Sequence, residues 1–305
     1  MKKVSCIIPT YNSAKTIAET IMSLKNQTYT NIEIIVADDC STDGTLKAVW
    51  YTLQSKPHRE FKILTNDWNT GGPNNGKNKA LEVATGDYIT FCDHDDQWHP
   101  DRIRLQVEQM ERTGCLIGTT GRKNIDIRTG EEQVFIGKKE VFEANEAFMA
   151  TIAPDYKKQT AYHILADIMI DKSLSHYRFE NLYGVSEFSW MMSVFHNRRT
   201  CEVHLPLSIR IITGDNFSLS NVYRKKDFIC KRQMYIMWEE QYPKEIKRCR
   251  WKYEGSEGRY NYLQGNYPQA RKHFLRSKPT LKNIAYYVSS FVCPEFVKTH
   301  FHIFG

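Results

Sequence analysis

Short apolar runs alternate with stretches of helical spacing through the first 110 residues. Between two of the runs, Ile17, Ile21 and Leu24 recur at intervals of three and four positions. Strands that alternate with helices predict a parallel sheet with helices on both faces. We therefore expect an α/β fold with a doubly wound, mostly parallel central sheet. The expected strands are residues 4–9, 32–37, 61–64 and 88–92.

Polar residues stand where three of these expected strands end. Residues 9–11 are Pro-Thr-Tyr, residues 38–39 are two aspartates, and residues 93–96 read Asp-His-Asp-Asp. Ligands bind at the carboxyl ends of the strands in open parallel sheets. Three such ends at one edge of the sheet therefore predict a binding site that all of them help to build.

The acidic group after the fourth strand predicts a divalent-metal site. Asp93, Asp95 and Asp96 place three carboxylates within four residues. Carboxylates this close repel one another unless a cation lies among them. A metal ion at such a position commonly neutralises phosphate groups. The alternative is a solvated acidic loop without a ligand.

Composition places the chain among soluble globular proteins. Of its 305 residues, 41% are apolar and 25% are charged, which is ordinary for that class. No run approaches about 18 consecutive apolar residues, so we expect no membrane-spanning helix. Met1 and the two lysines after it lead directly into the first strand, and we expect no signal peptide.

Cysteine usage indicates a reducing compartment. The chain has 8 cysteines, and no two of them form a CxxC pair, so the spacing excludes zinc and redox motifs of that type. Several lie in apolar strand runs, as expected of reduced core thiols in a cytosolic protein. The cysteines are Cys6, Cys40, Cys92, Cys115, Cys201, Cys230, Cys249 and Cys293.

Charge is distributed unevenly along the chain. Residues 221–305 carry 17 Lys and Arg against 7 Asp and Glu, whereas residues 1–220 carry 25 against 28. A near-neutral body with a basic tail predicts that the tail meets an anionic surface.

Two segments of this tail have helical patterns. Residues 258–277, which contain Tyr262, Ala270 and Phe274, resemble one helical hairpin of the tetratricopeptide type. Residues 284–292 are apolar and aromatic and lie between lysines. They suit either an amphipathic segment on a membrane surface or a helix docked on the protein body.

Four motifs follow one another in the first 100 residues. They are VSCIIPTYN at 4–12, IVADDCSTDGT at 35–45, NTGGP at 69–73 with KNKAL at 77–81, and DHDD at 93–96. In this order they resemble the motifs of the family 2 glycosyltransferases of the GT-A fold, and DHDD matches the family's DxD motif. The match is dense over residues 3–110 and thinner to about residue 220.

The resemblance implies a GT-A, Rossmann-like sheet and a domain layout. It implies a catalytic domain at residues 1–220, with a nucleotide-binding half at 1–110 and an acceptor half at 111–220. The basic residues 221–305 then form a helical C-terminal extension.

The resemblance also implies roles at the strand ends. Asp39 corresponds to the acid that accepts a hydrogen bond from the uracil ring N–H, and Pro9 and Tyr11 line the base pocket. Lys77 takes the place of a basic residue that faces the nucleotide, although it also suits a surface helix position. The implied donor-binding residues are Pro9, Thr10, Tyr11, Asp39, Lys77, Asp93 and His94.

Mn²⁺ or Mg²⁺ is the implied cofactor. We expect Asp95 to be its direct carboxylate ligand, with Asp93 at the metal or at the donor ribose. Asp96 is expected to cap a helix or to lie near the metal without contacting it. Many family members add a His ligand from the segment that matches residues 210–218, and here Asp215 or water takes that place.

Glu187 is the expected general base, which an inverting transferase needs to deprotonate the acceptor hydroxyl. It matches the second acid of the family's Glu-Asp pair, whereas Ser186 replaces the first. Glu180 is the alternative base. Glu187 also suits an ordinary helix cap.

These features predict a metal-dependent, inverting glycosyltransferase. The expected donor is UDP-hexose or UDP-N-acetylhexosamine, and the expected acceptor is a saccharide or lipid-linked saccharide in cell-surface polysaccharide synthesis. We expect a cytoplasmic protein, peripheral on the inner face of the plasma membrane through an anionic surface that meets the basic extension. No nucleic-acid partner is expected.

Two other functions stay open. The replacement of an acid by Ser186 suits a protein that binds nucleotide sugars without catalysis. Residues 71–78, GGPNNGKN, nearly spell the phosphate-binding P-loop of an NTPase. However, Asn78 lacks the hydroxyl that such a loop offers to Mg²⁺, and Pro73 removes an N–H from the phosphate cradle.

Overall fold

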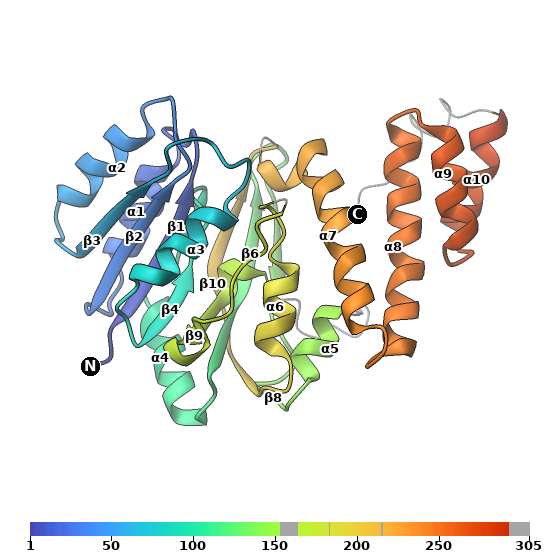
Figure 1. Cartoon of the computed structure of the whole chain (residues 1–305). Helices are drawn as coiled ribbons and strands as arrows, with labels where there is room; N and C mark the ends of the chain where they lie inside the picture. The colour runs from blue at the N-terminus through green and yellow to red at the C-terminus, as the bar shows by residue number, and fades with distance from the viewer. Residues whose placement is uncertain (153–163, 183, 215, 293–305) are drawn as a thin grey trace. The chain divides into compact units, whose positions relative to one another are not determined.

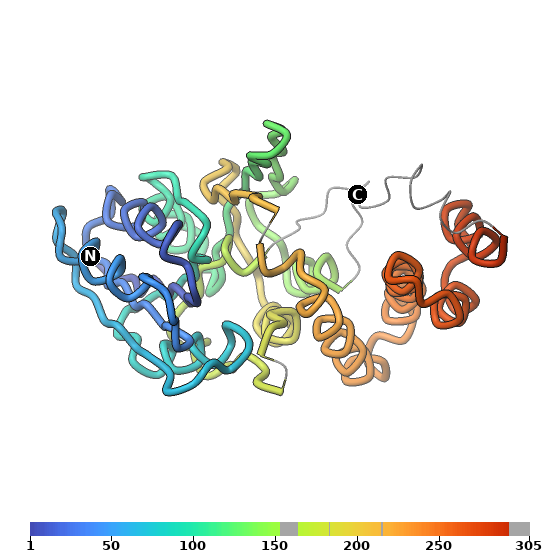
Figure 2. The backbone as a smooth tube through the Cα atoms, turned by 90° about the horizontal axis from the view of Figure 1, so that it is seen from above, coloured from blue at the N-terminus to red at the C-terminus, as the bar shows by residue number. Residues whose placement is uncertain are grey.

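The chain falls into two compact units, Met1–Lys231 and Arg232–Gly305. The first unit is mixed α/β, and the described part of the second is helical (Figures 1 and 2). The division falls inside helix α7, Asn221–Trp238, and the expected boundary after residue 220 stays a prediction. The structure, a computed structural model, describes residues 1–152, 164–182, 184–214 and 216–292.

A ten-stranded sheet forms the centre of the described part of the first unit. Its main path runs β3-β2-β1-β4-β9-β6-β10-β5, with β7 beside β6 and β8 beside β10. Neighbours among β1 to β4 pair in parallel, as do β6 and β10, whereas β9 lies antiparallel between β4 and β6. The strands are β1 Val4–Thr10, β2 Ile32–Asp38, β3 Glu60–Thr65, β4 Tyr88–Phe91, β5 Asp96–Trp98, β6 Ile117–Asp126, β7 Glu131–Phe135, β8 Val141–Phe142, β9 Ile168–Asp171 and β10 Thr200–Ile212.

The strand register brings the carboxyl ends of β1, β2 and β4 to one edge. β1 pairs with β2 residue for residue, so that Thr10 lies opposite Asp38. Backbone bonds extend the pairing past the strands, from the Asp39 N–H to the Thr10 oxygen and from the Cys92 N–H to the Ile7 oxygen, each 2.9 Å long. The polar residues after these strands therefore start from neighbouring positions.

Helices cover both faces of the sheet (Figures 1 and 2). Alternate β1 residues, including Cys6 and Ile8, share a buried core with Ile17 and Ile21 of α1 and with apolar residues of α2 and α4. On the other face α3 packs on β2, where Gly76 lies against Ala37. The helices are α1 Ile17–Lys25, α2 Thr45–Gln54, α3 Asn74–Val83, α4 Arg102–Thr113, α5 Glu146–Ile152 and α6 Phe188–Phe195, with short 3₁₀ helices at Leu165–Asp167, Lys172–Leu174 and Phe217–Leu219.

An aromatic cluster attaches α6 to the carboxyl end of β4. The ring of Phe91, the last residue of β4, lies 5.4 Å from those of Phe179 and Trp190. Phe179 and Trp190 stack on each other at 4.8 Å. The Lys77 ammonium lies 5.2 Å from the centre of the Phe179 ring. The start of α6 is thereby held close to the polar edge of the sheet.

The second unit contains a helical hairpin at the expected place. α8, Pro243–Leu263, and α9, Tyr267–Arg276, are joined by a short turn, and Tyr262, Ala270 and Phe274 are buried between them. A Cβ at Gly258 would lie 2.8 Å from the Phe274 ring. The two helices therefore approach too closely at this point for a larger residue.

A third helix, α10 at Leu281–Val292, packs on this hairpin. Tyr286 joins the buried cluster, and the Ser289 hydroxyl bonds to the Tyr262 hydroxyl at 3.0 Å. Residues 284–292 therefore pack on helices of the second unit, and the alternative of an amphipathic segment on a membrane surface stays a prediction. No helix in the described ranges has both the length and the apolar character that a membrane crossing requires.

The described cysteines are free thiols, and Cys293 lies outside the described residues. Cys40 is the only one of them that is not buried. It follows β2 with φ +64°, a left-handed conformation in which the Cβ of an L-residue crowds the next carbonyl. The strain therefore comes from the backbone conformation and the Cβ. Any residue other than glycine would have it, with or without a thiol.

Replacing Cys40 with Gly is expected to raise the free energy of unfolding by about 0.5–1 kcal/mol. Glycine removes the crowded Cβ, a gain of roughly 1–2 kcal/mol, and loses part of it to the greater freedom of the unfolded chain. Urea denaturation followed by tryptophan fluorescence measures the change. Cys40→Ala keeps the Cβ and serves as the control, and an equal gain in both variants would contradict the backbone explanation.

Candidate active site

The edge formed by β1 and β2 carries the expected base-binding residues. Pro9 and Thr10 are buried at the end of β1, whereas the Tyr11 side chain is 43% exposed just beyond it. Asp39 is buried and starts the segment after β2. An exposed aromatic ring beside a buried carboxylate is an arrangement that can take a planar base by stacking and hydrogen bonding.

The Asp39 carboxylate is fixed by the loop between β3 and α3. Its Oδ1 accepts hydrogen bonds from the Asn66 amide at 2.7 Å and from the Thr70 hydroxyl at 2.8 Å. The Thr70 N–H lies 3.0 Å from both carboxylate oxygens. A carboxylate offers about four acceptor positions, so Oδ2 has capacity for a further N–H donor.

Close backbone contact joins this loop to the segment before α6. A Cβ at Gly72 would lie 2.1 Å from the Gly184 oxygen, so only glycine fits. Two residues later, the Asn74 N–H donates to the same oxygen at 3.1 Å, and the Asn74 side chain donates to the Ser186 oxygen at 3.0 Å. The first turn of α3 therefore positions the residues that lead into α6.

Lys77 and Glu187 form a buried ion pair. The Lys77 ammonium lies 2.5 Å from Glu187 Oε1, with the Lys77 side chain fully buried and that of Glu187 25% exposed. Glu187 occupies the N-cap position of α6 but makes no capping side-chain hydrogen bond. Lys77 is thus not a surface residue, and Glu187 is directed to the cation instead of capping its helix.

Opposing influences act on the ionisation of Glu187. Burial raises the pKa of Glu187 above its ordinary value, and the negative charges of Asp93 and Asp227 raise it further. The Lys77 ammonium lowers this pKa. Asp93 of the acidic segment after β4 is therefore close enough to the start of α6 for its charge to affect the ionisation of Glu187.

Asp227 of α7 is a member of the site that the sequence analysis missed. Its Oδ1 accepts a hydrogen bond from the Ser186 hydroxyl at 3.2 Å, and Lys231, one turn later, lies 2.6 Å from Oδ2. Ser186 is the residue that replaced an expected acid, and a carboxylate from α7 stands beside it. The only local signal was a single acid within the basic stretch 224–231.

Asp96 differs from the expectation of a helix cap. It is the first residue of β5 and pairs with Arg210 of β10, whereas α4 begins only at Arg102, with Asp101 at its N-cap position. Burial raises the pKa of Asp96 well above its ordinary value, and the charges of Asp93 and Asp95 add to this effect, while Arg210 opposes it. Asp96 is therefore a buried acid in the neighbourhood of the other two.

Asp95 is held by an amide from the segment after β10. The Asn216 side chain donates to Asp95 Oδ2 at 2.8 Å and to the Ile211 oxygen at 2.9 Å. Asn216 thus occupies the region where a His ligand was considered, and Asp215 lies outside the described residues. The His94 side chain lies on the side of α1, with Nδ1 3.5 Å from the hydroxyl of Thr16, the residue before that helix.

The acids after β4 fit a divalent cation that completes its coordination with donor oxygens. The described residues contain no group of three His, Cys, Asp or Glu side chains placed to hold a metal together. Mg²⁺ usually binds one or two carboxylates and takes its other ligands from water and substrate phosphates. The repulsion that raises the pKa of Asp96 would be reduced by a cation near Asp93 and Asp95.

Glu180, the alternative base, is engaged within the segment before α6. Its Oε1 accepts hydrogen bonds from the Ser186 N–H at 3.4 Å and from the Cys230 thiol at 3.4 Å. These contacts join Glu180 to the backbone at Ser186 and to α7. Glu180 therefore supports the conformation of this segment.

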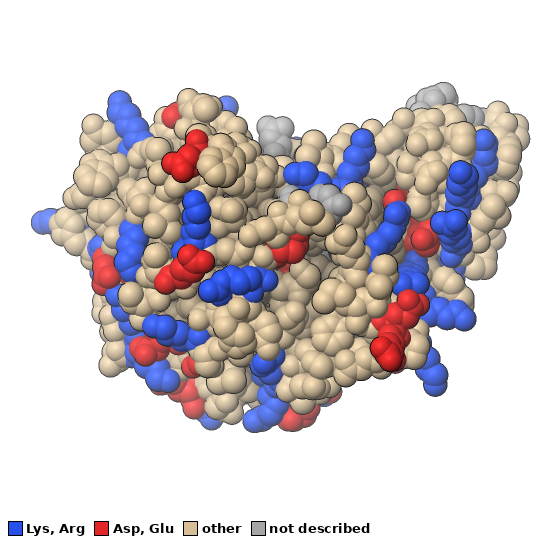
Figure 3. Space-filling model, in the orientation of Figure 1, with Lys and Arg blue, Asp and Glu red and all other residues tan. Residues whose placement is uncertain are grey.

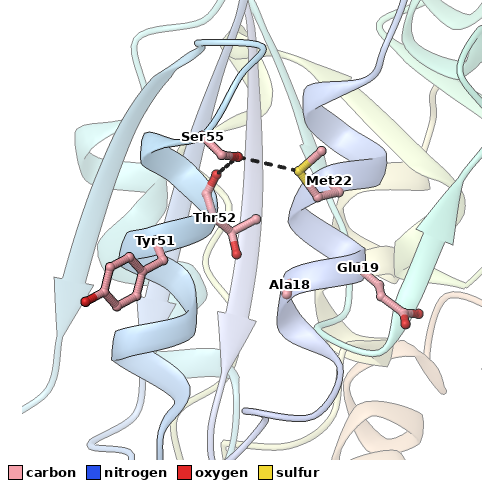
Figure 4. A pocket seen from close by; sticks show the side chains of 6 residues that line it. All are labelled: Ala18, Glu19, Met22, Tyr51, Thr52 and Ser55. Atoms are coloured by element: carbon pink, nitrogen blue, oxygen red, sulfur yellow. Dashed lines mark hydrogen bonds between the residues drawn. The ribbon is translucent and has the colours of Figure 1, made fainter.

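A shallow groove between α1 and α2 lies outside this site (Figure 4). None of the expected donor-binding, metal or base residues lines it. The groove has no cluster of charged groups that would suit a diphosphate. Its lining residues are Ala18, Glu19, Met22, Tyr51, Thr52 and Ser55.

The chain belongs to glycosyl transferase family 2, because the model of that family matches residues 5–193. One curated relative is the UDP-Glc:alpha-D-GlcNAc-diphosphoundecaprenol beta-1,3-glucosyltransferase WfgD of Escherichia coli, 38% identical over 107 residues. Another is the poly(ribitol-phosphate) beta-N-acetylglucosaminyltransferase TarS of Staphylococcus aureus, 39% identical over 106 residues. These matches cover 35% and 34% of this chain, and they span only 40% and 18% of the two relatives.

Solved structures of TarS have the same fold. One covers 97% of this chain and 91% of its own, with a TM-score of 0.65 and 18% identity. A second, in complex with UDP-GlcNAc, covers 94% of this chain and 79% of its own, with a TM-score of 0.65 and 20% identity. This likeness confirms the expected GT-A fold class with a helical C-terminal region.

The structure does not support the P-loop alternative. β3 ends at Thr65, and α3 begins only at Asn74, so the loop does not pass directly from strand to helix as a P-loop does. Lys77, which would have to reach a phosphate, is buried against Glu187.

Opposite substitutions around Glu187 are expected to shift its pKa in opposite directions. Lys77→Met removes the cation that lowers this pKa, so the pKa should rise further above its ordinary value. Asp227→Asn removes a negative charge, so the pKa should fall back toward that value. Titration of the ¹³C-labelled glutamate carboxyl groups by NMR, with the Glu187 signal assigned through Glu187→Gln, measures both shifts.

Asp227→Asn keeps this experiment decisive if Lys77→Met does not fold, because the loss of a buried partner is strongly destabilising. Lys231→Met is a matched control for a cation that contacts Asp227 and not Glu187. A fall in the pKa for Lys77→Met, or no change for Asp227→Asn, would contradict the described electrostatics.

Proposed function

We propose that this protein is a metal-dependent, inverting glycosyltransferase that uses a UDP-activated hexose or N-acetylhexosamine. The acceptor is a saccharide or a lipid-linked saccharide of a cell-surface polysaccharide. Family membership supports transfer of a sugar from a nucleotide donor. The names of WfgD and TarS, which include UDP-glucose, a diphosphoundecaprenol-linked sugar and N-acetylglucosaminyl transfer, support the finer assignment.

The observation that carries the proposal is the position of Glu187. It lies at the start of α6, bonded to Lys77 and electrostatically coupled to Asp93 of the acidic segment. A carboxylate beside the acidic end of β4 is where a base would stand to activate a nucleophile against a nucleotide-bound sugar. The Lys77 ammonium favours the ionised form of Glu187, which is the form that accepts a proton.

The proposed reaction is a single displacement. The acceptor hydroxyl oxygen forms a bond to the anomeric carbon while the bond from that carbon to the diphosphate oxygen breaks. The hydroxyl proton passes to Glu187, and the electron pair of the broken bond leaves with UDP. Because Lys77 occupies Oε1, we assign Oε2 as the proton acceptor. Attack opposite the leaving group inverts the configuration at the anomeric carbon.

Asp95 is the proposed carboxylate ligand of Mn²⁺ or Mg²⁺, with Asp93 at the metal or at the donor ribose. Asn216 fixes Oδ2 of Asp95 through a 2.8 Å hydrogen bond, which orients the carboxylate before a cation arrives. When bound, the cation supplies charge neutralisation for the departing diphosphate. The remaining coordination positions are then available to phosphate oxygens and water.

The proposed donor site uses the edge of β1 and β2. Asp39 Oδ2 accepts the uracil ring N–H, and the exposed Tyr11 ring packs on the base beside Pro9 and Thr10. The Asn66 and Thr70 contacts hold Asp39 in place before the donor binds. We also propose that the protein works in the cytoplasm, where nucleotide sugars and membrane-bound acceptors meet.

The Ser186–Asp227 contact argues against a binding protein without catalysis. That alternative was based on the missing acid at position 186. Asp227 brings a carboxylate to the Ser186 hydroxyl at 3.2 Å, so negative charge beside Glu187 is retained from a different helix.

Glu187→Gln is expected to lower the rate of UDP release from the preferred donor by roughly 10²–10⁴-fold, the usual contribution of a general base. UDP binding, measured by calorimetry with Mn²⁺, should stay near the wild-type value because the base does not contact UDP. Glu180→Gln is the matched control and should retain activity. The reverse result, with Glu180→Gln inactive and Glu187→Gln active, would move the base to Glu180.

Asp95→Asn is expected to abolish the Mn²⁺-dependent part of UDP release while the folded structure survives, because an amide is a poor ligand for a hard cation. Thermal unfolding with a panel of nucleotide sugars, with and without Mn²⁺, measures donor binding independently of turnover. The proposal would be refuted if no nucleoside diphosphate sugar raised the Tm in the presence of Mn²⁺. Full activity of Asp95→Asn under chelation would refute the metal assignment.

A further inference from the structure

Helix α10 turns its polar face inward and its apolar face outward. The residues buried against α8 and α9 are Asn283, Tyr286, Ser289 and Ser290. The apolar residues of the same helix are exposed, with between 47% and 89% of each side chain accessible. These residues recur at helical spacing and form one stripe, here called the α10 stripe: Leu281, Ile284, Val288, Phe291 and Val292.

Specific contacts fix this orientation. The Asn283 amide donates to the Ser277 hydroxyl at 3.1 Å and accepts from Arg259 at 2.7 Å. The same amide packs closely on Gly255 of α8, where a Cβ would lie only 2.5 Å from the Asn283 nitrogen. Rotating α10 to bury the stripe would break these bonds and that of Ser289 to Tyr262. The outward apolar face is therefore built into the packing of the unit.

The sequence around the α10 stripe is basic. Residues 267–292 contain five Lys and Arg and no Asp or Glu. Lys282 is exposed next to Leu281 at one end of the stripe. At the other end the Arg271 guanidinium lies 4.3 Å from the centre of the Phe291 ring and donates to the Ser290 oxygen at 3.1 Å. Basic side chains are also visible over α8 and α9 in Figure 3.

We propose that the α10 stripe binds the surface of an anionic lipid bilayer. The described part of the helix, 12 residues, is about 18 Å long, shorter than the hydrocarbon core is thick. A helix with one apolar face and flanking cations lies in the plane of the interface, with apolar side chains among the acyl chains and cations at the phosphates. The proposal concerns the helical unit and does not depend on the catalytic assignment.

Charge favours a bilayer over a second copy of the chain as the occupant. A symmetric contact between two α10 stripes would bring two sets of cations together without an acid from residues 267–292 to offset them. Like charges across an interface oppose association. An anionic surface, by contrast, attracts these cations, and each Lys or Arg near it raises the binding constant roughly fivefold.

Sedimentation of the full chain with vesicles tests the proposal. The probes are vesicles of phosphatidylcholine alone and of phosphatidylcholine with a quarter of phosphatidylglycerol. Val288→Asp and Phe291→Asp should each lower binding to the anionic vesicles by about tenfold, because a charge replaces an inserted apolar group. Lys282→Glu should lower binding roughly fivefold or more, and only on the anionic vesicles.

Ile127→Asp is the matched control, because it introduces the same charge at an apolar residue of the first unit that is 60% exposed. It should bind vesicles like the wild type. Circular dichroism and Tm verify folding of each variant, which is expected because the substituted side chains are exposed. UDP release should be unchanged in all of them, so a failure of this proposal is distinguishable from a failure of the proposed function.

Equal vesicle binding by the wild type, Val288→Asp and Phe291→Asp would overturn the proposal. So would binding that does not depend on phosphatidylglycerol. Light scattering after size exclusion provides a further check. A wild-type dimer that Val288→Asp converts to a monomer, without any vesicle binding, would assign the stripe to a second copy of the chain.

Discussion

The ion pair between Lys77 and Glu187 is the contact on which the site depends. A fully buried ammonium is tolerated only beside a partner, and the partner here comes from 110 residues later in the chain. The cation on α3 therefore determines where α6 can begin. The same contact favours the ionised form of a carboxylate whose pKa burial raises. The contact between α3 and the start of α6 and the ionisation of Glu187 thus both depend on this ion pair.

The sheet and its polar edge could be predicted from the sequence because both follow from local patterns. Apolar runs identified β1 to β4 with each boundary within one residue, and the spacing of Ile17, Ile21 and Leu24 identified α1. The positions of Asp39 and Asp93 followed from the rule that parallel strands present their carboxyl ends at one edge. The roles of Asp39, Lys77, Asp93 and Asp95 stay predictions, since placement at an edge does not establish what a side chain binds.

Contacts between distant segments could not be predicted, because they leave no periodic signal. The bond between Ser186 and Asp227 joins residues 41 positions apart, and that between Asp95 and Asn216 joins residues 121 apart. Asp96 was expected near a helix start, yet pairing with β10 draws it into β5. The sequence indicated an apolar and aromatic helix at α10. Which of its faces turns inward could not be predicted, because it depends on the contacts of Asn283 and Ser289 with α8.

The balance of charge at the site explains why the proposed chemistry requires a metal. Asp93, Asp95 and Asp96 are acids at the edge where the proposal places an anionic diphosphate, and the Arg210 charge opposes the effect of the other two acids on the pKa of Asp96. Lys77, at the position where the resemblance implies a basic residue facing the nucleotide, is committed to Glu187. Its positive charge is therefore largely used before a donor arrives. We therefore propose that a cation held by the same acids neutralises the leaving diphosphate, in which case the Lys77–Glu187 ion pair would make donor binding depend on that metal.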